Sequence, residues 1–179
     1  IIDSDGSRQL AYTILGFIEG SPALVDIDGD QDLEIAFTTT TSSGGQLYVI
    51  HHNGITVSGF PKELGSMWAG PAVHDIDNDG LFDVVVTTYD KEIYAIEANG
   101  GTVKSGFPFV TEGRFSTAPI IVDVDSDGDY EIVAGNKDVF IKGACNVTVT
   151  GDCRMLYQGD LVQEVEGDYH LNVLGDMRT

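Results

Sequence analysis

The sequence is poor in cations, proline and cysteine, and it lacks long apolar runs. Its 179 residues contain only 9 Lys and Arg against 29 Asp and Glu, which gives a net charge of -20. Binding to nucleic acid or to an anionic membrane needs clustered Lys and Arg, so the composition argues against both partners. No apolar run approaches the roughly 20 residues of a membrane span. Two cysteines do not define a disulfide framework.

Sequence motifs of catalytic and cofactor-binding sites are lacking as well. The sequence contains no nucleophile paired with a base, no phosphate-binding loop, no dinucleotide fingerprint and no Cys/His zinc spacing. We interpret His51 and His52 as an exposed pair in a turn without a partner cluster. Trp68, together with Met67 and Phe60, is interpreted as packing between strands rather than as a sugar platform. We therefore expect that the chain is not an enzyme.

The carboxylates that are present gather in three short windows. The hydrophobic fraction of 42% is that of a folded protein, and 22 glycines suit many tight turns. Fourteen of the 29 acids lie in residues 26–34, 75–83 and 123–131, here named the first, second and third loops. Charge at this density repels itself unless a cation lies within it. The alternative is a solvated acidic surface with Asx-type turns.

The three loops belong to a longer repeat. Their first residues are 49 and 48 positions apart, and each loop lies between a short apolar stretch and a β-type run. A period of 40–50 residues with about four short strands is typical of a β-propeller blade. We predict an all-β fold in which residues 1–140 form a partial β-propeller. About three blades are too few to close the usual ring, so we expect an open arc.

The spacing of the acids within each loop suits Ca²⁺. Acids at positions 1, 3 and 5 can turn three oxygens toward one point, position 7 can add a carbonyl and position 9 a fourth carboxylate. Hard oxygen ligands in this number are typical of Ca²⁺. An EF-hand is excluded, because it needs Glu at position 12, where Phe37, Val86 and Ala134 stand here, and because the flanks are β-type rather than helical.

The pattern Asp-x-Asp-x-Asp-Gly-x-x-Asp resembles the calcium loops of the FG-GAP family, which includes integrin α-subunit propellers. The resemblance implies up to three Ca²⁺ sites, an extracellular or cell-surface location, and a structural, adhesive or ligand-recognition role toward an unknown protein or carbohydrate. It assigns as metal ligands the side chains of Asp26, Asp28, Asp30, Glu34, Asp75, Asp77, Asp79, Asp83, Asp123, Asp125, Asp127 and Glu131, and the carbonyls of Asp32, Leu81 and Asp129.

Two departures from the family pattern stand out. Gln31 occupies position 6 of the first loop, where the other loops have the turn glycines Gly80 and Gly128, so we expect this loop to bind its cation most weakly. Near the N-terminus, Asp3 and Asp5 precede a glycine in what we interpret as a truncated copy, and we do not predict binding there.

From about residue 141 the period changes to eight, without a linker. Five glycines recur at this spacing, at positions 143, 151, 159, 167 and 175, and the last four are followed by Asp. The pattern resembles the triple-stranded β-helix of the central spike of contractile phage tails. It implies that residues 141–179 form a β-helix or solenoid-like tail that joins three chains into a homotrimer. The alternative is a β-meander that completes the last blade.

Other interpretations of the whole chain remain open at this point. The chain could be a component of a phage tail spike, which would place it in the virion tail, or the non-catalytic propeller part of a secreted polysaccharide-active enzyme. The abrupt change of period near residue 140 also fits a junction of two unrelated pieces. The two regions, 1–140 and 141–179, are therefore treated as separate domains.

Overall fold

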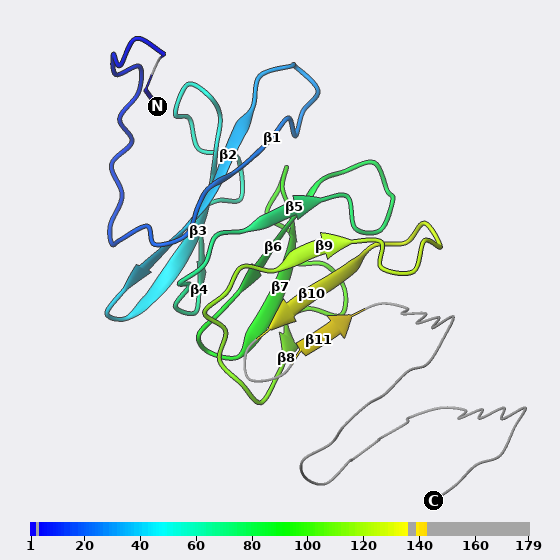
Figure 1. Cartoon of the computed structure of the whole chain (residues 1–179). Coiled ribbons are helices and arrows are strands. Elements are labelled where there is room, and N and C mark those ends of the chain that lie inside the picture. Colours follow the sequence, from blue (N-terminus) through cyan, green and yellow to red (C-terminus); the bar gives the residue numbers. More distant parts are fainter. Residues whose placement is uncertain (3, 136–138, 143–179) are drawn as a thin grey trace, which may run out of the picture. The chain divides into compact units, whose positions relative to one another are not determined.

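The computed structural model of the chain describes residues 1–2, 4–135 and 139–142 (Figure 1). Its described residues form strands and no helix, which confirms the all-β prediction for this part of the chain, and no helix there could span a membrane. The strands are β1 (Ala23–Val25), β2 (Glu34–Thr41), β3 (Gly44–Ile50), β4 (Lys62–Leu64), β5 (Ala72–His74), β6 (Asp83–Thr87), β7 (Glu92–Glu97), β8 (Phe109–Val110), β9 (Ile120–Val122), β10 (Glu131–Gly135) and β11 (Val139–Lys142).

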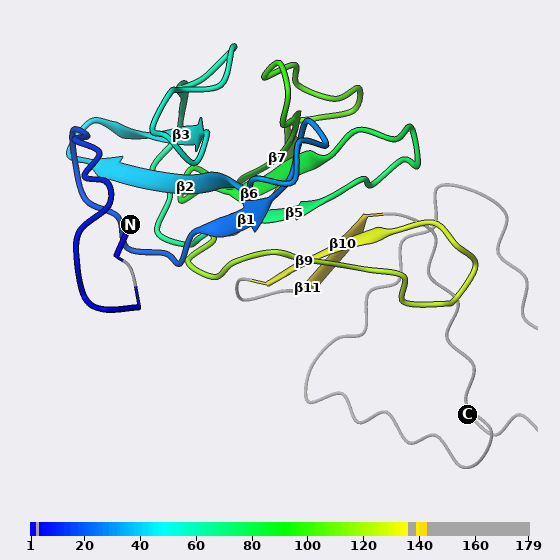
Figure 2. The same ribbon diagram turned by 90° about the horizontal axis from the view of Figure 1, so that it is seen from above.

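The strands form three antiparallel sheets that follow the predicted repeat. The first sheet has the order β1-β2-β3-β4, the second β5-β6-β7-β8, and the third β9-β10-β11. Each sheet is a meander in which neighbours in sequence are neighbours in space, as expected for blades with short connections. The described sheets do not close on themselves, in agreement with the expected open arc. Figure 2 shows the same sheets from above.

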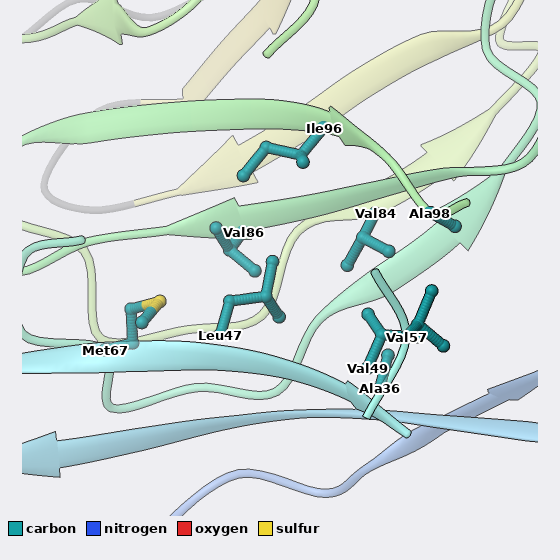
Figure 3. Packing of buried hydrophobic residues seen from close by; sticks show 9 residues of the cluster. All are labelled: Ala36, Leu47, Val49, Val57, Met67, Val84, Val86, Ile96 and Ala98. Atoms are coloured by element: carbon teal, nitrogen blue, oxygen red, sulfur yellow. The ribbon is translucent and has the colours of Figure 1, made fainter. Parts of the chain in front are cut away.

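The sheets pack against one another through alternate residues of their strands. All five residues of β6 are buried because this strand has a neighbouring sheet on both faces. Val84 and Val86 join a cluster with Leu47 and Val49 of the first sheet, as Figure 3 shows, whereas Val85 joins a cluster with residues of the third sheet. Successive side chains of a strand point to opposite faces, which explains the continuous run of valines.

Two glycines allow the first strands of neighbouring sheets to approach closely. A Cβ atom on Gly20 would lie 1.9 Å from the backbone nitrogen of Gly70, and one on Gly70 would lie 2.0 Å from the carbonyl oxygen of Ser21. Gly20 lies three residues before the first residue of β1, and Gly70 lies two residues before the first residue of β5. Because backbone contacts backbone there, glycine is required at both positions, and the acidic loops that follow the two strands start from neighbouring points.

The N-terminal segment covers the outer face of the first sheet. Phe17 and Thr40 exchange two backbone hydrogen bonds of 2.9 Å. The ring of Tyr12 meets Phe37 and Tyr48 edge-on, with ring centroids 6.3 and 6.1 Å away, and its hydroxyl lies 2.8 Å from the Thr56 hydroxyl. The segment therefore packs on this sheet where another blade would lie in a propeller.

The third sheet continues beyond the domain boundary predicted at residue 140. Strand β11 crosses that position, and Ile141 and Lys142 pair with Val133 and Ile132 of β10. The β-meander alternative is therefore observed as far as residue 142. The octad glycines from 143 on, the β-helix and the homotrimer fall on residues outside the described part, so they stay predictions.

Candidate metal centres

Each acidic loop connects the first two strands of its sheet. The residue at position 9 is the first residue of β2, β6 or β10. In the strand register it lies opposite the residue that precedes position 1, as in the pairs Val25 with Glu34 and His74 with Asp83. The antiparallel pairing thus returns the acid at position 9 to the start of the loop. Figures 1 and 2 show the three loops extending from the same end of their sheets.

Backbone hydrogen bonds curl all three loops in the same way. The carboxylate at position 1 accepts the N–H of position 6, with N···O distances of 3.1, 2.8 and 3.1 Å in the first, second and third loops. The carboxylate at position 5 accepts the N–H of position 7 at 2.8, 2.8 and 3.0 Å. Asx-type turns are therefore present, and they coexist with the clustering of the acids.

Positions 4 and 6 have left-handed backbone in every loop. At position 6, φ is +87° for Gly80, +95° for Gly128 and +75° for Gln31. The glutamine therefore adopts the conformation that the glycines favour, and the first loop keeps the shape of the other two. The expected effect of Gln31 is thus a backbone strain rather than a different loop.

Replacing Gln31 by glycine should raise the free energy of unfolding by about 1 kcal/mol, because glycine adopts a positive φ without steric cost. Urea denaturation of the full chain measures this change. The matched control is Gly80→Gln, since a Cβ on Gly80 meets no atom within 4 Å and only the backbone is affected. That control should lower stability by a similar amount, and equal stability of Gln31→Gly and the parent chain would contradict the prediction.

The acids at position 9 are completely buried. Glu34, Asp83 and Glu131 are each 0% exposed. One oxygen of each accepts the N–H of position 2, at 3.0, 3.3 and 2.9 Å in the first, second and third loops. The other oxygen has a different environment in each loop, and this difference separates the three sites.

In the first loop, His51 faces the second oxygen. Its Nδ1 atom lies 3.0 Å from Oε1 of Glu34, and His52 Nδ1 lies 3.5 Å from the Asp32 carboxylate. The interpretation of these histidines as a pair without partners is wrong, because β3 ends directly beside β2 and brings both to the loop. Ligand atoms of Asp28, Glu34 and His51 lie within 4.8 Å of one another, as do those of Asp26, Asp28 and Asp30.

In the second loop, a lysine lies among the acids. Lys104 Nζ is 2.7 Å from Asp77 Oδ2, 3.3 Å from Asp79 Oδ2 and 3.4 Å from Asp83 Oδ1. Burial lowers the pKa of Lys104, but its hydrogen bond to Asp77 and the charge of Asp83 raise this pKa more, so the ammonium stays charged. Burial raises the pKa of Asp83 above its usual value. The structure also groups Asp75 with Asp77 and Asp83.

In the third loop, the second oxygen of the buried acid has no hydrogen-bond partner among the described residues. Glu131 Oε1 is buried and accepts no hydrogen bond from any described residue. Oxygens of Asp123, Asp125 and Asp127 lie within 4.8 Å of one another in the same loop. A buried carboxylate oxygen without a partner is costly, and a hard cation beside it would remove that cost. The donor set of this loop therefore fits Ca²⁺.

The structure thus brings the predicted carboxylates together in groups that differ between the loops. The acids at positions 1 and 3 are grouped in all three loops, those at position 5 only in the first and third, and Glu131 is in no group. The assignment of the Asp32, Leu81 and Asp129 carbonyls as ligands stays a prediction. Near the N-terminus, Asp5 accepts the N–H of Ser7 at 2.8 Å, like position 5 of the full loops.

The second and third loops are in direct contact. The side-chain amide of Asn78 donates to the carbonyl oxygen of Gly128 at 3.2 Å. The ring of His74, which directly precedes the second loop, and the ring of Tyr130 in the third loop have centroids 3.9 Å apart. A change in the shape of one loop would therefore displace the groups of the other loop that contact it.

Sequence reasoning missed two residues of the candidate sites, His51 and Lys104. A comparison of the repeats could have found Lys104, because it directly precedes Ser-Gly-Phe-Pro at the place that Val57 takes in the first repeat. The interpretation of Trp68, Met67 and Phe60 as packing between strands is confirmed for Met67 and Phe60, which belong to or pack against the core cluster of the first two sheets, but not for Trp68. Met67 is buried, but Trp68 is 46% exposed and stacks on Tyr89 with ring centroids 4.9 Å apart.

Comparisons with known proteins agree with this repeat architecture. The chain resembles the crystal structure of the V. cholerae biofilm matrix protein Bap1, with a TM-score of 0.55 and 21% identity. The match covers 69% of this chain and 23% of that one, so the chain spans about a quarter of Bap1, and the likeness concerns the fold. The search of the curated proteins found no match. The model of the FG-GAP-like repeat matches residues 26–86 and 75–134, so the chain belongs to the FG-GAP-like repeat family.

Proposed function

We propose that this part of the protein is a calcium-binding repeat module in which bound Ca²⁺ rigidifies the acidic loops at one end of the sheets. The observation that carries the proposal is the third loop, which has three clustered Asp carboxylates and a buried Glu131 oxygen without a hydrogen bond from any described residue. Such an all-oxygen set with several carboxylates is typical of Ca²⁺ rather than of Zn²⁺ or Mg²⁺. The same curled backbone in all three loops supports a shared role.

The module's role follows from what rigid loops can do. Loops held on a packed β scaffold offer a fixed surface to a partner, and Ca²⁺ would remove the mutual repulsion of the acids. We propose a structural, adhesive or ligand-recognition role toward a protein or a carbohydrate outside the cell, without catalytic activity of its own. The fold of Bap1, a biofilm matrix protein, is consistent with this role.

The test is a calorimetric titration of CaCl₂ into the full chain after chelation of bound metal. We expect saturable binding, with the strongest class of sites lost when Asp123, Asp125 and Asp127 are changed together to Ala. The matched control changes Glu19, Glu63 and Glu112 to Ala, since these three acids are exposed and lie outside the loops, and it should keep all binding. Absence of binding at millimolar calcium, or equal loss in the control, would overturn the proposal.

A further inference from the structure

Lys104 enters the second loop from a position that is apolar in the preceding repeat. Its backbone N–H donates to the carbonyl of Ala95 in β7, just as the N–H of Val57 donates to the carbonyl of Val49 in β3, both at 2.9 Å. The backbone is therefore equivalent, and only the side chain differs. Val57 is 5% exposed and belongs to the apolar cluster between the first and second sheets, whereas the lysine side chain reaches the acidic loop.

The ammonium group is surrounded by three of the four carboxylates that the second loop offers. It lies within 3.4 Å of oxygens from Asp77, Asp79 and Asp83, which are positions 3, 5 and 9. The lysine side chain is only 11% exposed, so it is held in the loop rather than swinging in solvent. The remaining acid, Asp75, accepts the backbone N–H groups of Asp79 and Gly80.

These contacts place a positive charge among the carboxylates that would otherwise surround a metal ion. Asp83 Oδ1 corresponds to Glu131 Oε1 of the third loop, and both oxygens are buried and accept no hydrogen bond from a described residue. In the second loop the lysine supplies that oxygen with a positive charge. A divalent cation bound by the same oxygens would lie next to the ammonium, and two like charges at this distance repel each other strongly.

We propose that Lys104 is a built-in counter-cation that holds the second loop in its curled shape without calcium and competes with Ca²⁺ for it. This inference rests on the proposed calcium function and refines it, because it makes the second loop, rather than the first loop with Gln31, the weak site, between two loops without an internal lysine contact in the described structure. The three loops of the chain then bind calcium with unequal affinity. The hydrogen bond from Asn78 to Gly128 connects the lysine-held loop to the third loop.

The experiment isolates the second loop within the full chain. Asp28→Ala and Asp125→Ala remove position 3 from the first and third loops, and calcium binding is then measured by calorimetry with Lys104 or with Lys104→Met. We expect Lys104→Met to raise the calcium affinity of the second loop at least tenfold, while Lys104→Arg, which keeps the charge, leaves it weak. Lys62→Met is the matched control for net charge, since Lys62 is in none of the described ion pairs with loop acids.

A second readout does not depend on binding heat. In chelator, Lys104→Met should lower the unfolding temperature, because three acids lose their counter-charge, and excess calcium should restore it. Unchanged affinity in Lys104→Met, while the first and third loops of the parent chain bind calcium, would overturn the lysine proposal and leave the calcium function standing. Absence of binding in the parent chain and in Lys104→Met alike would overturn both.

Discussion

Calcium at one hundred times its dissociation constant should raise the free energy of unfolding by about 2.7 kcal/mol for each occupied loop. The loops exist only in the folded chain, since the strand pairing brings position 9 back to position 1. With the second loop held by Lys104, two occupied loops should contribute roughly 5 kcal/mol together. Urea denaturation of the full chain, in chelator and in calcium, measures the difference.

The third loop should supply one of these two contributions. Asp125→Ala should remove about 2.7 kcal/mol of the rise in the free energy of unfolding that calcium causes. The same substitution should change the free energy of unfolding in chelator much less. Mg²⁺ at the same concentration should stabilise less, because it demands octahedral geometry and retains its waters. Identical denaturation midpoints with chelator and with calcium would contradict the prediction.

Leu47→Ala should lower the free energy of unfolding by about 2–5 kcal/mol. Leu47 is 0% exposed and lies in β3 within the cluster that joins the first and second sheets, facing Val84 and Val86 (Figure 3). Truncation loses the transfer free energy of the side chain and leaves a cavity that packed sheets fill only in part. Urea denaturation in saturating calcium measures the loss.

The control for this prediction is Leu24→Ala. Leu24 lies in β1 and is 59% exposed, so its truncation should change stability by less than about 0.5 kcal/mol. A loss below about 1 kcal/mol for Leu47→Ala would show that the two sheets do not share one core.

The loop spacing and the strand order could be predicted from the sequence because both are local. Three copies of one acidic pattern, each between apolar stretches, predict three hairpins with acids at their turns, and the structure has β1–β2, β5–β6 and β9–β10 in those places. Gln31 shows the limit of such reasoning. Glutamine disfavours the left-handed backbone that position 6 requires. Its backbone nevertheless adopts φ of +75°, because the Asp26 carboxylate accepts its N–H.

What faces each buried acid could not be predicted, because the partners come from other strands. The sequence determined that an acid stands at position 9 of every loop, and the β-pairing that follows from the apolar pattern buries it. Only the tertiary structure decided that Glu34 meets His51, that Asp83 lies beside Lys104 and that Glu131 Oε1 accepts no hydrogen bond from a described residue. Lys104 is 21 residues from Asp83, and it reaches the loop only because the segment after β7 returns beside it. Three loops that are alike in sequence therefore differ in the group that faces their buried acid.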